Sequence, residues 1–341
     1  MELMQRKEKI LSAVVESYIA TGEPIGSRAL QDITGLTVSS ATIRNELASL
    51  VDEGYLHQPH TSAGRVPTRK GYRYYIDNIC KLEYPSDRLK ERLERLINSV
   101  EQIPETILAK TARTLSELTD MAAVCTSPSS IDARVHKIRF VSTGRHTSMA
   151  VLVTSNGMVK SRLFRCEFVL TPEILSMFDK AINEKFSGVR LLDINVAFLQ
   201  TVASSFGELT LFMPEVLAAL LDAAKSAIKT SVTVSGETNL LFIDGYSLNC
   251  ARNVLKFLSD SQSVTQLLDD IYPNKVSLSD ENNRFELIGS SVITSRYTIM
   301  GENAGSIALI GPMRVDYKKL IGLVDYSALC VSNAIGQMLE N

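Results

Sequence analysis

The sequence predicts an α+β protein of more than one domain, because its periodicity changes along the chain. Residues 1–80 show helical patterns and short turns that end in a segment punctuated by Gly and Pro. Residues 104–188 and 272–341 contain short β-branched runs beside helices, and residues 189–271 between them are apolar and mainly helical in pattern. A length of 341 residues also exceeds one typical core, so two or three domains are expected.

The first helices of the chain precede residue 39. Apolar residues at helical spacing predict the first one: Leu3, Ile10, Val14 and Tyr18. Residues 21–24 break this pattern, and Ser27 can cap a second, short helix that ends near Asp32. Residues 33–38 contain Gly35 and predict a turn into a further helix, which is the order of a helix-turn-helix.

That further helix has one apolar and one polar face. Ser39 or Ser40 is expected at its N-cap, and Gly54 ends it. The buried stripe is Ile43, Leu47 and Leu50. The opposite face is small or polar with one long cation: Ser40, Ala41, Arg44, Asn45 and Ala48.

Such a face suits a helix that reads bases in a major groove, since small side chains allow close approach and Arg can donate two hydrogen bonds to guanine. Under this interpretation Arg44 is the principal base reader, and the groove-facing set is Ser40, Thr42, Arg44 and Asn45. An ordinary solvated helix face is the alternative.

A cationic segment follows this helix. Between Gly54 and Ile76 there is no acidic residue, and four positions are cationic: Arg65, Arg69, Lys70 and Arg73. Such a segment favours contact with a DNA backbone. Its Gly and Pro residues predict a hairpin with residues 60–62 at the tip, so residues 1–80 are predicted to form a winged helix-turn-helix.

Apolar side chains at helical spacing follow the hairpin: Tyr72, Tyr75, Ile76 and Ile79. We expect a helix whose tyrosines are buried against the winged domain, because the spacing alone accounts for them. Stacking of the tyrosines on bases, as in proteins that bind single strands, is the alternative.

Several segments resemble the bacterial heat-inducible transcription repressor family HrcA. They are residues 22–28 (GEPIGSR), 39–46 (SSATIRNE) and 58–68 (QPHTSAGRVPT), with shorter matches at residues 236–240 and 310–317. The resemblance covers essentially the whole chain, and its N-terminal motifs are long and contiguous.

The resemblance implies a homodimeric repressor that binds an inverted-repeat operator of double-stranded DNA upstream of chaperone operons of the groE and dnaK type. It also implies relief of repression by heat shock, modulation by the GroE-type chaperonin, and no cofactor. Together with the patterns above, it gives these DNA-binding residues: Ser27, Arg28, Ser39, Ser40, Thr42, Arg44, Asn45, His60, Thr61, Ser62, Arg65, Arg69 and Lys70.

The rest of the chain divides into a connector and two further domains. A narrow stripe of Leu89, Leu93, Leu96 and Val100 predicts a connector helix in residues 81–103, and the next helix starts at Pro104 and carries its stripe to Ala122. Strands are predicted in two blocks: residues 135–141, 149–154 and 158–164, and residues 275–278, 285–294 and 306–310. These blocks suggest one antiparallel sheet domain, interrupted by an insertion.

The resemblance supplies names for these parts: a discontinuous GAF-like domain in residues 104–188 and 272–341, and an inserted dimerisation domain in residues 189–271. Helices are expected at residues 212–228 and at residues 251–271, broken near Ser259. Candidates for the dimer interface lie near one helical face: Phe212, Val216, Leu220 and Ile228. The alternative is that they fill the core of their own domain.

Composition argues against other classes of protein. The formal net charge of −2 means that DNA affinity must come from a local patch. The N-terminus lacks the apolar core of a signal peptide and no apolar run reaches about 20 residues, so a cytoplasmic protein with no membrane partner is expected. Five scattered cysteines without a Cys-x-x-Cys argue against disulfides and a zinc site, and the sequence lacks P-loop, dinucleotide-binding and serine-hydrolase motifs.

We therefore expect a repressor rather than an enzyme. A winged-helix regulator whose GAF-like domain senses a small molecule is the alternative function.

Overall fold

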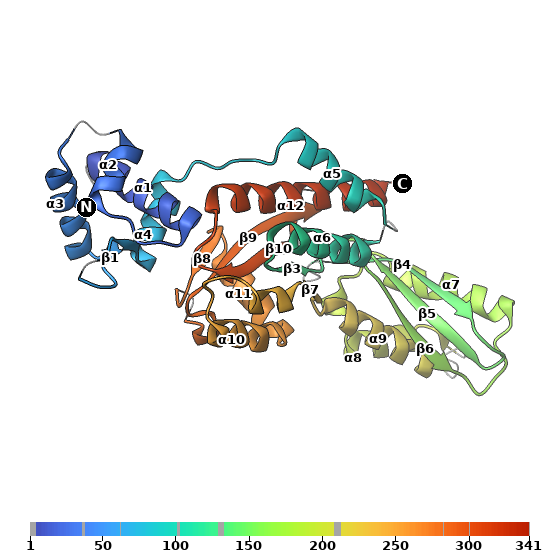
Figure 1. Cartoon of the computed structure of the whole chain (residues 1–341). Helices are drawn as coiled ribbons and strands as arrows, with labels where there is room; N and C mark the ends of the chain where they lie inside the picture. Colours follow the sequence, from blue (N-terminus) through green and yellow to red (C-terminus); the bar gives the residue numbers. More distant parts are fainter. Residues whose placement is uncertain are drawn as a thin grey trace.

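The computed structural model describes residues 5–35, 38–61, 63–100, 103–128, 133–207, 213–281, 283–299 and 301–340. Helices and antiparallel sheets coexist, which confirms the α+β class. Figure 1 shows three parts: an N-terminal unit, a central unit and an inserted unit at the far end of the molecule from the N-terminal one.

The N-terminal unit (residues 5–79) consists of helices around a small apolar core, with a short hairpin. Its elements are α1 (Gln5–Thr21), α2 (Ser27–Thr34), α3 (Ser40–Asp52), β1 (Leu56–His57), β2 (Val66–Pro67), α4 (Arg69–Tyr74) and a π-helical turn (Tyr75–Ile79). Its buried residues include Ile10 and Val14 of α1, Leu30 of α2, and Ile43 of α3. Gly26 and not Ser27 holds the N-cap position of α2, so the predicted Ser27 cap is wrong by one residue, because Gly26 adopts the extended backbone that a cap requires.

The central unit is built on an antiparallel sheet of five strands among the described residues, in the order β7-β3-β10-β9-β8. The strands are β3 (Ala122–Thr126), β7 (Val232–Ser235), β8 (Val276–Leu278), β9 (Ser290–Ile299) and β10 (Glu302–Pro312). One face packs against α6 (Pro104–Thr119) and α12 (Tyr317–Glu340), and the other against α10 (Leu248–Leu258) and α11 (Ser261–Ile271). Successive side chains of β10 alternate between the two faces. Ile307 and Leu309 pack in the core with α6 and α12, and Ala308 and Ile310 pack in the core with α10 and α11.

Helix α5 (Asp87–Asn98) occupies the predicted connector, but it packs on the central unit. Its Leu93 and Ile97 belong to the same apolar cluster as α12, and Glu94 accepts a hydrogen bond of 2.5 Å from the Tyr326 hydroxyl. In Figure 1 an extended segment leads from the N-terminal unit to α5, which lies along α12.

The inserted unit has its own sheet and its own core. Strands β4 (Val135–Ser142), β5 (Thr147–Thr154) and β6 (Val159–Arg165) pair in that order, and α7 (Pro172–Phe186), α8 (Val196–Ser204) and α9 (Pro214–Ile228) contribute to one apolar cluster with them. This cluster runs from Ala133 to Ile228, whereas α10 and α11 belong to the central unit.

Two sequence predictions about this region are therefore wrong. The two blocks of strands form separate sheets and not one interrupted sheet, and the packed insertion does not coincide with residues 189–271. The reason lies in β3 and β7, which supply the central sheet with the strands that β4, β5 and β6 were expected to provide. Helix α6 ends at Thr119, and the fully buried segment Ala122–Thr126 is a strand with both faces covered, not the end of a helix.

The expected dimer residues on α9 are core residues of the inserted unit. Val216 is 0% exposed and Leu220 is 1% exposed, and Ile228 packs against the same core. Phe212 lies outside the described residues. Val216 and Leu220 therefore fill the core of their own unit, which is the alternative to the dimer interface. A side chain buried in this way cannot contact a second subunit.

Candidate nucleic-acid interface

Helix α3 is fixed in place by its cap and by one apolar face. Ser39 is the N-cap: its Oγ accepts a hydrogen bond of 3.1 Å from the backbone N–H of Thr42 and lies 3.0 Å from the Thr42 hydroxyl. The predicted stripe of Ile43, Leu47 and Leu50 is buried. Burial of this stripe turns the opposite face of α3 to solvent.

That exposed face carries Arg44 and Asn45 of the residues predicted to read bases, whereas Thr42 is half-buried with its hydroxyl beside the Ser39 cap. Ala41, Arg44, Asn45 and Ala48 are exposed, and Ser40 is half-buried at the first turn. Arg44 forms no ion pair with any residue that the structure describes. A small surface with one free guanidinium can approach a polyanion closely and donate two hydrogen bonds to a base edge.

Glu46 of α3 and Glu53 at its C-cap are paired with cations from α1, whereas the exposed Asp52 forms no ion pair among the described residues. Arg6 forms an ion pair with Glu46, its Nε lying 2.9 Å from Glu46 Oε1. Lys7 Nζ lies 2.5 Å from Glu53 Oε1 and 2.8 Å from the Ser49 hydroxyl. The hydrogen bond from Lys7, assisted by one from Ser49, lowers the pKa of the Glu53 carboxyl below its ordinary value.

Arg6 and Lys7 therefore reduce the negative potential beside the exposed face of α3. The sequence prediction did not include them. The positions of Arg6 and Lys7 beside the apolar stripe of α1 indicate that both lie on one side of that helix. Their partners could not be predicted in the same way, because they lie about 40 residues away in the chain.

The hairpin tip is ordered by its own polar groups. Gln58 Nε2 donates to the carbonyls of Thr61 (2.9 Å) and Ala63 (3.1 Å). His60 and Thr61 are exposed at the tip, whereas Ser62 lies outside the described residues. The exposed tip lies in the same unit as α3.

The second arm of the hairpin is tied, just before β2, to the segment before α2. Ile25 and Arg65 form an antiparallel bridge with hydrogen bonds of 3.1 and 2.8 Å. A Cβ on Gly64 would lie only 2.4 Å from the Ile25 carbonyl oxygen, so only glycine fits at this approach. Arg65 is half-buried and donates to the Ala63 carbonyl (3.2 Å). Beyond the bridge, α2 presents Arg28 to solvent, with Ser27 half-buried.

The cations of α4 differ from Arg44 because they already have partners. Lys70 Nζ donates to the Glu53 carbonyl (2.8 Å) and lies 4.3 Å from the centre of the Tyr55 ring. Arg69 forms an ion pair with Asp280, and Arg73 with Glu281, both on the central unit. All three pairings leave the side chains partly accessible to solvent.

The tyrosines after the hairpin are packed, which confirms their predicted burial. Tyr72 is 2% exposed and its ring lies 5.9 Å from that of Tyr317, while Tyr75 is 1% exposed and its hydroxyl lies 3.3 Å from Glu16. Tyr317 belongs to the central unit, so Tyr72 packs between two units rather than within the N-terminal unit alone.

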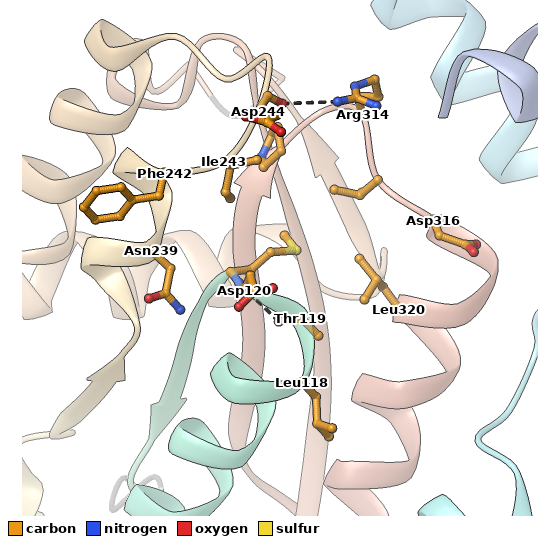
Figure 2. A pocket seen from close by; sticks show the side chains of 13 residues that line it. Leu118, Thr119, Asp120, Asn239, Phe242, Ile243, Asp244, Arg314, Asp316 and Leu320 are labelled. Atoms are coloured by element: carbon orange, nitrogen blue, oxygen red, sulfur yellow. Dashed lines mark hydrogen bonds between the residues drawn. The ribbon is translucent and has the colours of Figure 1, made fainter. Parts of the chain in front are cut away.

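A cavity of about 580 Å³ opens near the contact between α1 and the central unit. Figure 2 shows Arg314 at one edge of this cavity, donating to the Asp244 carbonyl (3.2 Å), and Phe242, Asn239 and Asp120 at the opposite side. Arg314 also donates to the Ile19 carbonyl at the end of α1 (3.3 Å). A ligand in this cavity would therefore contact a side chain that touches the N-terminal unit.

Comparison of the sequence with known proteins shows the family of the chain. Residues 105–321 match the model of the HrcA protein C-terminal domain. The chain is 33% identical to the heat-inducible transcription repressor HrcA of Thermoanaerobacter pseudethanolicus, covering 100% of this chain and 99% of the relative. The chain belongs to the HrcA family. Members of this family are transcription repressors and not enzymes, and their name describes them as heat-inducible.

Other HrcA relatives cover similar shares of the chain. The HrcA protein of Desulforudis audaxviator is 30% identical over 99% of both chains, and that of Clostridium perfringens is 34% identical over 94% of this chain and 95% of the relative. A crystal structure of a hypothetical protein shares the fold at a TM-score of 0.65 and 20% identity, covering 98% of this chain and 99% of that one. In the described part of this HrcA chain, no helix is long and apolar enough to cross a membrane.

Proposed function

We propose that the N-terminal unit is a winged helix-turn-helix that binds double-stranded DNA through α3 and the hairpin. The observation that carries this proposal is the exposed face of α3, where Arg44 and Asn45 stand among small side chains while Glu46 and Glu53 are paired with α1. Helices that read the major groove combine such a face with a buried stripe. The hairpin and Arg28 would contact the flanking backbone.

The proposed target is an inverted-repeat operator upstream of chaperone operons of the groE and dnaK type, with repression relieved by heat shock and modulated by the GroE-type chaperonin in the cytoplasm. These properties rest on membership of the HrcA family and on the name of its members. The central unit would be the GAF-like domain of such a repressor.

An inverted repeat requires a two-fold protein, so we include a homodimer in the proposal. The open face of the sheet in the inserted unit fits this role better than α9. In β5 the side chains of Met149, Val151 and Val153 are only half-buried, and the register places Val141 and Leu163 opposite Met149 and Val159 opposite Val153. Val141, Val159 and Leu163 are 45%, 46% and 69% exposed.

Exchange of Leu163 for aspartate tests this interface. Leu163→Asp should give a folded monomer, because the side chain is exposed and its loss leaves the core of the unit intact. Analytical ultracentrifugation would measure the mass and circular dichroism the folding, with Arg162→Asp on the same strand as a control. A folded Leu163→Asp variant that is still fully dimeric would exclude this face.

Footprinting on the promoter of the organism's own chaperonin operon tests the whole proposal. We expect two protected half-sites with centres one helical turn, about 10 base pairs, or a multiple of it apart. The proposed operator would be contradicted if the promoter were protected only at concentrations that also protect random DNA.

A small-molecule sensor is the second candidate function, favoured by the cavity beside Arg314. The test compares operator affinity in cell extract with that of the purified protein. A purified protein that reaches the affinity seen in extract only after cell metabolites are added would support this candidate. Equal binding without metabolites would exclude it.

A further inference from the structure

Besides the packing of Tyr72 on Tyr317, two sets of polar contacts hold the N-terminal unit against the central unit. At the end of α1, Arg314 donates to the Ile19 carbonyl and Lys318 Nζ lies 2.7 Å from Glu16. At α4, the contacts are formed by acids in the loop that follows β8. Figure 1 shows the N-terminal unit beside the end of the central unit where β8 and the start of α12 lie.

The α4 set occupies two arginine side chains. Arg69 donates to the Asp280 carboxylate. Arg73 donates from Nε to Glu281 Oε1 (3.0 Å), from Nη2 to the second oxygen of Glu281, and from Nη2 to the Val276 carbonyl (2.9 Å). Glu281 is itself held in place, since it accepts a hydrogen bond of 2.8 Å from the backbone N–H of Leu278. We refer to Asp280 and Glu281 together as the acidic latch.

A carboxylate and a phosphate compete for the same guanidinium donors, because both present two oxygens to the planar fork of arginine. Arg69 begins α4 directly after the hairpin, in the segment that has no acid of its own. An Arg69 side chain paired with Asp280 cannot donate the same hydrogen bonds to a DNA phosphate.

We propose that the acidic latch is an intramolecular competitor of the DNA backbone for α4, so that the free protein holds its N-terminal unit docked and operator binding releases it. This inference rests on the proposed function, since it regulates the same DNA-binding surface. The docked and DNA-bound arrangements exclude each other at Arg69, and the apparent affinity for DNA therefore falls with the fraction of molecules in which the latch is closed.

The docked arrangement is weak enough for DNA to displace it. Arg69 and Asp280 have side chains 47% and 51% exposed, and ion pairs this exposed contribute little and are screened by salt. The interface also buries the Tyr72 hydroxyl, which has no hydrogen-bond partner among the described residues. A buried hydroxyl without a partner destabilises the docked arrangement, and undocking would return it to water.

Neutralising the latch tests the proposal. The variant is Asp280→Asn with Glu281→Gln, and the control is Asp270→Asn with Glu286→Gln, which removes the same charge from the central unit at two acids that form no ion pair among the described residues. Operator affinity, measured by fluorescence anisotropy at low salt, should rise about 3- to 10-fold above the control. The gain should shrink as salt is added, since salt also opens the latch of the unchanged protein.

Hydrogen exchange of the free proteins gives a measurement that does not depend on DNA. The latch variant should exchange faster than the control in residues 69–76 and 276–281, and equally in the inserted unit. Exchange and affinity that both equal those of the control would overturn the latch. Absence of operator binding by the unchanged protein, the variant and the control would instead contradict the proposed function, and faster exchange in the variant would still show that Asp280 and Glu281 hold the units together.

Discussion

The one cation of α3 and the cations of α4 lie in one small unit, but they differ in what they contact. Arg44 on α3 forms no ion pair within the described chain, whereas Arg69 and Arg73 on α4 face acids that lie more than 200 residues later in the sequence. Glu46 of α3 and Glu53 at its C-cap are even paired with Arg6 and Lys7 of α1. The difference shows that the number of cations in a segment does not give the number available to DNA.

The largest expected effect is the difference between a substitution on the buried face of α3 and one on its exposed face, measured as the free energy of unfolding. Leu47→Ala removes a side chain that is 3% exposed, so the free energy of unfolding should fall by about 2 to 5 kcal/mol through lost burial and a cavity. The exposed Ala48→Ser variant should change it by less than about 0.5 kcal/mol. Denaturant titration followed by circular dichroism measures both, and equal losses would show that α3 is not oriented as described.

The salt dependence of DNA binding tests whether the cations of α4 contact DNA phosphates. Arg69→Ala together with Lys70→Ala should flatten the slope of log affinity against log salt by roughly two units, because each lost phosphate contact removes about 0.9. Arg162→Ala with Arg165→Ala, on exposed positions of β6, removes the same charge far from the N-terminal unit and should leave the slope unchanged. An unchanged slope in the α4 variant would place these side chains away from DNA.

The pairing of α1 with α3 should have the smallest effect, and it should depend on pH. Lys7→Met should lower the free energy of unfolding by about 0.2 to 1 kcal/mol, since the pair is only partly buried. The pKa of Glu53 lies below its ordinary value of 4.5, so its contribution is fully present above pH 4.5 and is lost as the pH falls through the folded value.

Thermal unfolding between pH 3 and 7 would check the pH dependence. The variant and the unchanged protein should differ at pH 7 and converge at pH 3. A difference that stays constant across this range would assign the effect to the aliphatic part of Lys7 instead.

Local features of the molecule could be predicted from the sequence. The cap at Ser39, the stripe on α3 and the break at Ser259 between α10 and α11 depend on neighbours within a few residues, so periodicity and capping chemistry suffice for them. Asp316 likewise lies at the start of α12 and accepts from the Lys319 N–H (3.3 Å), as expected of a cap.

The sheets and the ion pairs between units could not be predicted in this way. Strand β3 is buried on both faces and therefore lacks the alternation that identifies a half-buried strand, and its partners β7 and β10 lie about 100 and 180 residues further on. The pairing of Arg69 with Asp280 depends equally on the tertiary fold, so the sequence shows a cation but not its partner.

Binding of the Arg44→Ala variant to operator and to random DNA tests the central claim most directly. The account predicts a loss of about 1 to 3 kcal/mol for each half-site on the operator and little change on random DNA of equal length, because Arg44 reads a base edge. Circular dichroism should show an intact fold, since the side chain is exposed. Equal losses on both DNAs would show that Arg44 contacts only phosphate, and no loss on either would contradict the assignment of α3 as the reading helix.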